Sequence, residues 1–157
     1  MRITNFFLTC LFVTMLSCGH QNREKKSIIN EFANRNIEFA DSVRFVVILP
    51  ASGCGNCIRE GFNFISRNLR HFNCNNEAIQ IIFTSIQSPK MLLRTLGIEA
   101  FEYHCFKVDF DNRYRLSGVN AAFPLILYLE NGEITDLEFQ SPNNTLAFHR
   151  LEEELNI

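Results

Sequence analysis

Apolar positions form two kinds of pattern that alternate along the chain from residue 43 onward. Nearly uninterrupted apolar runs at residues 43–49 and 78–85 predict strands that are buried on both faces of a parallel sheet. Between these runs, apolar residues recur at intervals of three or four, which predicts one buried stripe along a helix of about four turns. The residues of this stripe are Ile58, Phe62, Ile65, Leu69 and Phe72.

A second helix and a third strand follow. Ser88 and Pro89 are a favoured N-cap and a favoured first helical residue, and Gly97 suits the position just after the last helical turn. Residues 105–110 predict a short strand.

The last third of the chain predicts a hairpin and a closing helix. Apolar runs at 124–129 and 134–139 flank Asn131-Gly132, the pair that a type I′ turn needs at its two left-handed positions. Residues 144–155 place leucines among charges, which is typical of a final surface helix. The order strand, helix, strand, helix, strand, hairpin, helix implies an α/β sandwich with a mixed sheet of about five strands.

The N-terminal residues have the composition of an export signal. Arg2 is the only charge in residues 1–17, and their apolar run is too short to span a bilayer comfortably as a helix. Ser17 and Cys18 follow this run and resemble the lipobox of bacterial lipoproteins, in which the cysteine is lipidated and becomes the new N-terminus. We therefore expect a signal peptide at 1–17 and lipidation at Cys18, with an ordinary cleaved signal as the alternative.

This interpretation gives the chain an organisation and a compartment. Residues 18–42 predict a polar tether, in which residues 27–40 have the pattern of a short amphipathic helix, and residues 43–157 form one domain. The protein is expected in the bacterial cell envelope, held by its lipid and facing the periplasm or the cell exterior, where disulfides persist.

Net charge and cysteine content limit the functions that the chain can have. The net charge is −2 and the basic residues are scattered, which excludes the basic face that nucleic-acid binding requires. Six cysteines are present; Cys10 leaves with the signal and Cys18 carries the lipid, so four remain for disulfide or metal chemistry. No cofactor and no metal is predicted.

Cys54 and Cys57 are placed where the first strand ends and the first helix of the domain begins. The helix N-terminus presents unpaired N–H groups and partial positive charge, which stabilise a thiolate. Cys57 lies about one turn further along, where it can attack a mixed disulfide formed at Cys54. Zinc sites use the same spacing, but Cys74 and Cys105 come from separate strand contexts and not from a second paired motif.

These motifs resemble the thioredoxin superfamily and, within it, the membrane-anchored TlpA-type oxidoreductases. Residues 46–57 are similar to the family's strand, turn and redox pair, and residues 124–134 to its proline-led hairpin. The resemblance implies a thioredoxin-like three-layer sandwich. It also implies a cis peptide bond before Pro124, substrate pairing by the backbone of Phe123, and Glu60 as a candidate for proton transfer.

The sequence also departs from that family. The tryptophans before the redox pair are absent, and Ile48 stands where thioredoxins bury an aspartate. The expected activity is thiol-disulfide exchange with protein dithiols or disulfides and an unknown redox partner. A redox-inert binding module on the same scaffold is the alternative. Cys74 and Cys105 are predicted near the same end of the sheet, either as a structural disulfide or as two separate thiols.

Overall fold

The computed structural model describes residues 23–72, 77–86, 88–97 and 103–157. The chain divides into two compact units between Asn36 and Ile37. In the first unit residues 23–34 are helical, so this helix starts and ends earlier than the pattern at 27–40 predicted. Within the described ranges, no helix has both the length and the apolarity that crossing a membrane requires.

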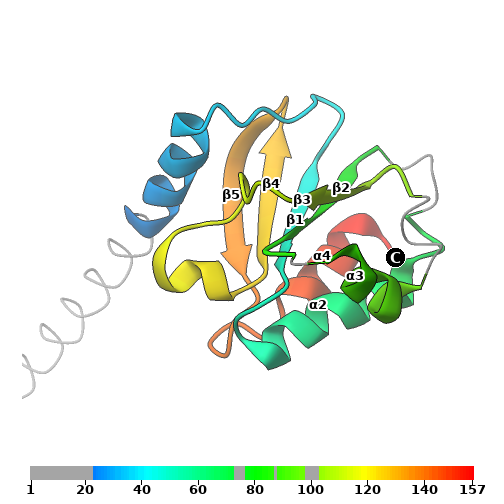
Figure 1. The fold of residues 1–157 in the computed structure, drawn as a ribbon. Coiled ribbons are helices and arrows are strands. Elements are labelled where there is room, and N and C mark those ends of the chain that lie inside the picture. Colours follow the sequence, from blue (N-terminus) through cyan, green and yellow to red (C-terminus); the bar gives the residue numbers. More distant parts are fainter. Residues whose placement is uncertain (1–22, 73–76, 87, 98–102) are drawn as a thin grey trace, which may run out of the picture. The chain divides into compact units, whose positions relative to one another are not determined.

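The second unit is built on one five-stranded mixed sheet (Figure 1). Its strands lie in the order β3-β2-β1-β4-β5, in which β1, β2 and β3 are parallel to one another and β4 and β5 run antiparallel to their neighbours. The strand bounds are β1 Phe45–Pro50, β2 Ile79–Thr84, β3 Phe106–Asp109, β4 Leu125–Glu130 and β5 Glu133–Phe139. The predicted α/β sandwich with a mixed sheet is therefore confirmed, and it is thioredoxin-like.

Three helices cover one face of this sheet (Figure 1). They are α2 (Gly55–Asn68), α3 (Pro89–Leu96) and α4 (Ala147–Leu155). Alternate residues of β1 and β2 bury their side chains against these helices, as the period-2 geometry of a strand requires. The aromatic ring of Phe64 in α2 stacks on that of Phe148 in α4 with centroids 4.9 Å apart.

The predicted helix and turn signals are confirmed. Ser88 Oγ accepts a hydrogen bond from the Lys90 amide at the start of α3, and Gly97 has a φ of 83° after its last turn. Asn131 and Gly132 have φ values of 51° and 79°, as a type I′ turn between β4 and β5 requires.

One element among the described residues was not predicted, the 3₁₀ helix η2 (Gly118–Ala122) between β3 and β4. Short 3₁₀ helices carry no periodic apolar pattern by which a sequence could predict them. The segment before η2 begins with the buried Asp109, whose carboxylate accepts hydrogen bonds from the amides of Arg113 and Tyr114 at 3.0 and 2.8 Å. These bonds fix the turn that carries the chain from β3 towards η2.

Candidate redox site

The two cysteines of the candidate site lie at the carboxyl end of the central strand. Open α/β sheets place their functional sites at the carboxyl ends of their strands. β1 ends at Pro50, and the amide of Ala51 donates a hydrogen bond to the Thr84 carbonyl at 2.9 Å. The turn that follows is thereby anchored to β2. Cys54 is the N-cap of α2 and has extended backbone angles, so the first helical turn begins directly after it.

Cys54 and Cys57 form a disulfide, with their Cα atoms 5.3 Å apart. Cys57 is only 5% exposed, whereas Cys54 is partly exposed. Thiol-disulfide exchange requires direct access of the attacking sulfur. The geometry therefore makes Cys54 the residue that an outside thiol or disulfide can reach.

The electrostatic surroundings of Cys54 favour negative charge. The first turn of α2 contains no acidic residue, so the positive end of its dipole is not neutralised there. The guanidinium of Arg59 donates a hydrogen bond of 3.1 Å to Asn56 Oδ1, which holds a cation at the turn between the cysteines. Sequence reasoning missed Arg59, although its position three residues after Asn56 on a helix was a signal.

The turn between the end of β1 and Cys54, residues 51–54, is called the redox turn below. Gly53 allows an unusually close approach between the redox turn and η2. Its φ is 143°, and a Cβ at this position would lie 2.4 Å from the carbonyl oxygen of Ala122. That same oxygen accepts a hydrogen bond of 2.8 Å from the Cys54 amide. A side chain at residue 53 would therefore separate Cys54 from the segment that precedes Pro124.

The structure corrects the expectation for Pro124. No peptide bond among the described residues is cis, so the bond between Phe123 and Pro124 is trans. Phe123 is extended, with φ −117° and ψ 144°, the conformation that a following proline favours. The trans isomer is the more stable form of an X–Pro bond unless its surroundings impose the other, and here it leads directly into β4.

Phe123 and Pro124 still lie near the redox turn, because they directly follow Ala122, whose carbonyl is bonded to the Cys54 amide. The Phe123 amide already donates a hydrogen bond to the Asn120 carbonyl at 3.3 Å, and the Pro124 carbonyl accepts one from the Gln140 amide at 3.0 Å. A substrate backbone can therefore pair with the carbonyl of Phe123 but not with its amide. The role of Phe123 in substrate binding stays a prediction.

Ile48 is buried in β1 and lines a small pocket beside the redox turn. The pocket lies between β1 and the segment that leads to β4, and its other lining residues include Tyr114, Leu116 and Asn120. An aliphatic side chain here cannot transfer a proton. Glu60 is exposed on α2, and its role in proton transfer stays a prediction.

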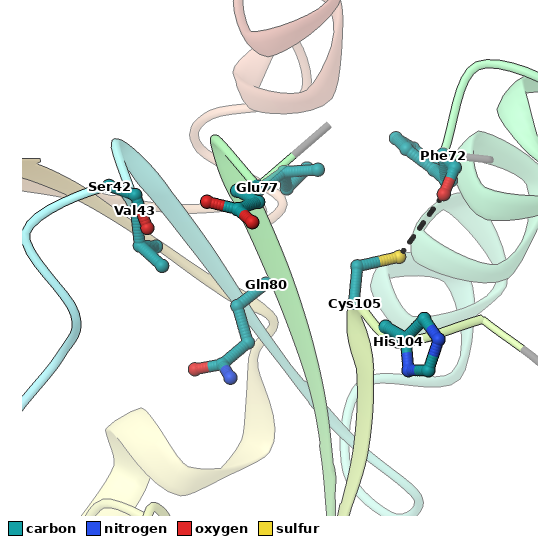
Figure 2. A pocket seen from close by; sticks show the side chains of 8 residues that line it. Ser42, Val43, Phe72, Glu77, Gln80, His104 and Cys105 are labelled. Atoms are coloured by element: carbon teal, nitrogen blue, oxygen red, sulfur yellow. Dashed lines mark hydrogen bonds between the residues drawn. The ribbon is translucent and has the colours of Figure 1, made fainter. Parts of the chain in front are cut away.

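Cys105 lies at the opposite end of the sheet, in a pocket at the amino ends of β2 and β3. Its sulfur donates a hydrogen bond to the Phe72 carbonyl at 3.6 Å (Figure 2). Figure 2 shows the Glu77 carboxylate turned towards Ser42, away from that sulfur. Cys74 and Cys18 lie outside the described residues. A disulfide between Cys74 and Cys105 and lipidation of Cys18 therefore stay predictions.

Comparison with known proteins adds no family assignment, because no protein-family model and no curated protein matches the chain. Function is therefore inferred from the geometry of the redox turn.

Proposed function

We propose that the chain is an extracytoplasmic thiol-disulfide oxidoreductase in which Cys54 attacks the substrate and Cys57 resolves the mixed disulfide. The observation that carries this proposal is the Cys54–Cys57 disulfide at a strand-to-helix junction, with Cys54 partly exposed and Cys57 buried. A structural disulfide gains nothing from this asymmetry, whereas sequential exchange requires one accessible sulfur and one protected sulfur.

The reaction follows from these positions. In the reduced protein the Cys54 thiolate attacks a substrate disulfide, forms a mixed disulfide and releases one substrate sulfur as a thiolate. Cys57, as thiolate, then attacks the Cys54 sulfur, which releases the second substrate thiolate and restores the Cys54–Cys57 disulfide. Two electrons pass from the pair to the substrate, and a thiol-bearing redox partner must return them for the next cycle.

The site stabilises negative charge on Cys54 for the first step. It assists the attack by Cys57 in the second step only weakly. The α2 N-terminus and the Arg59 guanidinium support a thiolate on Cys54. The aliphatic Ile48 provides no base, and we expect the proton of Cys57 to pass to solvent or to Glu60, which follows it by about one helical turn. We expect resolution by Cys57 to be the slower step.

The proposal includes the compartment and the partners. A signal peptide at 1–17 and a lipid on Cys18 would hold the domain at the surface of a membrane in the cell envelope. Protein dithiols and disulfides exposed to that compartment would then be the substrates.

Trapping of the intermediate tests the mechanism. In Cys57→Ser the resolving sulfur is absent, so mixed disulfides between Cys54 and client proteins should accumulate and appear as reducible adducts on non-reducing gels. The double variant Cys54→Ser, Cys57→Ser should form none of these adducts. Equal recovery of adducts from both variants would contradict the roles assigned to the two cysteines.

A redox-inert scaffold is the second candidate, and the burial of Cys57 and of the aliphatic Ile48 favours it. Titration of the pair against thiol buffers separates the two. A potential below about −300 mV is typical of structural disulfides that the glutathione pool does not reduce. A higher potential, together with trapped clients, supports the oxidoreductase.

A further inference from the structure

Ser85 directly follows β2 and has two locally unfavourable features. Its φ of 58° lies in the left-handed region, which a residue with a Cβ rarely adopts. Its hydroxyl oxygen is buried and has no hydrogen-bond partner among the described residues. Residues with such features are concentrated at functional sites, where the surrounding structure holds them in place. The groups that hold Ser85 therefore indicate what its conformation is for.

The peptide unit between Thr84 and Ser85 is bonded at both ends. Its N–H donates a hydrogen bond of 2.8 Å to Oδ1 of Asn112. Its carbonyl accepts one of 2.9 Å from the amide of Ala51, the first residue of the redox turn. Because a peptide unit is planar and rigid, its two ends cannot rotate independently. The hydrogen bond to Asn112 therefore also fixes the carbonyl that holds Ala51.

Asn112 is itself held in position for this contact. Its φ is 55°, which asparagine tolerates better than most residues, and its amide donates a hydrogen bond to the Asp109 carbonyl at 3.4 Å. The buried carboxylate of Asp109 accepts hydrogen bonds from the amides of Arg113 and Tyr114. The turn after β3 is thus fixed before and after Asn112, and its side-chain oxygen is presented to the Ser85 amide.

The redox turn is anchored through its backbone at both ends. The Ala51 amide is bonded to the Thr84 carbonyl at its start, and the Cys54 amide to the Ala122 carbonyl at its end. In the oxidised protein the disulfide constrains the turn as well. Reduction removes this constraint, so the position of Cys54 then depends more strongly on the backbone anchors.

We propose that Asn112 is a positioning residue for the redox pair, because its bond to the Thr84–Ser85 peptide unit fixes the start of the redox turn. It acts through this peptide unit and keeps the sulfur of Cys54 close to that of Cys57 when the pair is reduced. The inference rests on the proposed function and adds the residue that controls how readily the pair closes. Keeping two thiols close raises their effective concentration and favours their disulfide. Asn112 therefore makes the oxidised pair harder to reduce.

The equilibrium between the pair and glutathione measures this effect. The two thiols of the pair and one glutathione disulfide interconvert with the Cys54–Cys57 disulfide and two glutathione thiols, so two electrons and two protons are exchanged. A substitution that destabilises the oxidised and reduced proteins equally leaves this equilibrium constant unchanged. A changed constant therefore reports positioning and not a general loss of stability. Alkylation and mass spectrometry of the peptide that contains both cysteines give the oxidised fraction in the purified full chain.

Asn112→Gly removes the acceptor and keeps a residue that adopts a positive φ freely. It should shift the equilibrium constant towards the reduced pair by about threefold, or about 14 mV. This is the lower end of the range for one hydrogen bond, because Asn112 is exposed. Asn112→Asp keeps an acceptor oxygen and should stay close to the parent value. Asn156→Gly is the matched control and should leave the constant unchanged, since Asn156 has the same φ of 55° at the C-cap of α4.

Ser85→Gly separates the peptide unit from the side chain. Glycine relieves the left-handed strain and removes the buried hydroxyl, while the amide that Asn112 binds remains. This variant should unfold at a higher denaturant concentration and keep the parent's equilibrium constant. A shift as large as that of Asn112→Gly would mean that the Ser85 side chain acts on the pair, and it would overturn the assignment to Asn112.

Coupling between two sites is reciprocal, so the redox state must also act on the bond to Asn112. Amide hydrogen exchange at Ser85, followed by NMR in the parent protein, should be about threefold faster when the pair is reduced. This measurement needs no substitution, so it tests the inference even where a variant folds poorly.

Failure of the positioning role and failure of the proposed function are distinguishable. An unchanged constant in Asn112→Gly, or equal exchange at Ser85 in both redox states, would reject the positioning role and leave the oxidoreductase intact. A parent disulfide that glutathione buffers do not reduce, together with no trapped clients, would reject the proposed function and the positioning role together.

Discussion

The Cys54 amide donates a hydrogen bond of 2.8 Å to the Ala122 carbonyl, so a backbone hydrogen bond joins the redox turn to the segment before β4. Gly53 makes this contact possible because a Cβ there would overlap the Ala122 backbone. Gly55, two residues later, has no atom within 4 Å of the equivalent position. The two glycines therefore offer a matched pair of substitutions around Cys54.

Gly53→Ala should destabilise the oxidised protein by about 2 kcal/mol or more, because alanine is strained at a φ of 143° and clashes with Ala122. Gly55→Ala should stabilise it by about 0.4–1 kcal/mol, because alanine fits the open backbone position at the start of α2 and has less conformational freedom than glycine in the unfolded chain. Denaturant unfolding of both variants gives the comparison. Equal stabilities for the two would mean that residue 53 has no close contact with Ala122.

Asp109→Ala should cost about 2–4 kcal/mol, because it leaves the amides of Arg113 and Tyr114 without their carboxylate acceptor. Asp109→Asn keeps one acceptor oxygen and should lose roughly half as much. The free energy of unfolding of each variant measures the effect. If alanine and asparagine were equally mild, the turn after β3 would not depend on this side chain.

Glu138 connects β5 to α4 and should make stability depend on pH. Burial raises the pKa of its carboxyl, but hydrogen bonds from Arg150, Tyr128 and Asn144 together outweigh it, so the pKa lies below its ordinary value. A lowered folded-state pKa contributes stability above the ordinary pKa, and this contribution is lost as pH falls through the folded-state value. Stability should therefore decline below about pH 5.

Acid unfolding of Glu138→Gln checks this prediction. The variant should be less stable than the parent protein near neutral pH and should lose less stability on acidification. Glu133→Gln, at an exposed position on the same strand, should leave the acid transition unchanged. A Glu138→Gln transition with the parent's pH dependence would show that other groups cause the loss.

Cys18→Ala should release the protein from membranes, because the expected lipid would have no sulfur to attach to. Cys10→Ala should leave the protein membrane-bound, since Cys10 lies in the segment expected to be removed. Fractionation of cells that express each variant measures the distribution. Continued membrane association of Cys18→Ala would reject the anchor and, with it, the proposed compartment.

Much of the fold could be predicted because strong local signals coincide with buried elements. The run at 43–49 lies within one or two residues of β1, all of whose residues are buried. Ser88, Gly97 and Asn131-Gly132 have the cap and turn conformations that their residue types favour. Short-range patterns suffice where each residue's own preference agrees with the fold.

The surroundings of the redox pair could be predicted only in part. The position of Cys54 and Cys57 follows from a strand and a helix that have clear patterns, but the contact with Ala122 joins residues 68 positions apart through backbone atoms. No residue type announces such a contact except Gly53, whose need for a positive φ is visible only in the structure. The isomer of the Phe123–Pro124 bond is likewise set by tertiary surroundings, which is why a resemblance gave the wrong expectation.

The sheet order also determines which parts of the molecule can open locally. β1 has a hydrogen-bonded neighbour on each side, whereas β3 and β5 are edge strands. Amide hydrogens of a central, fully buried strand exchange with solvent mainly through global unfolding, while those of edges and loops exchange through local opening. We therefore expect the cysteine pair, which follows β1 directly, to be held by the part of the fold whose amide hydrogens exchange most slowly.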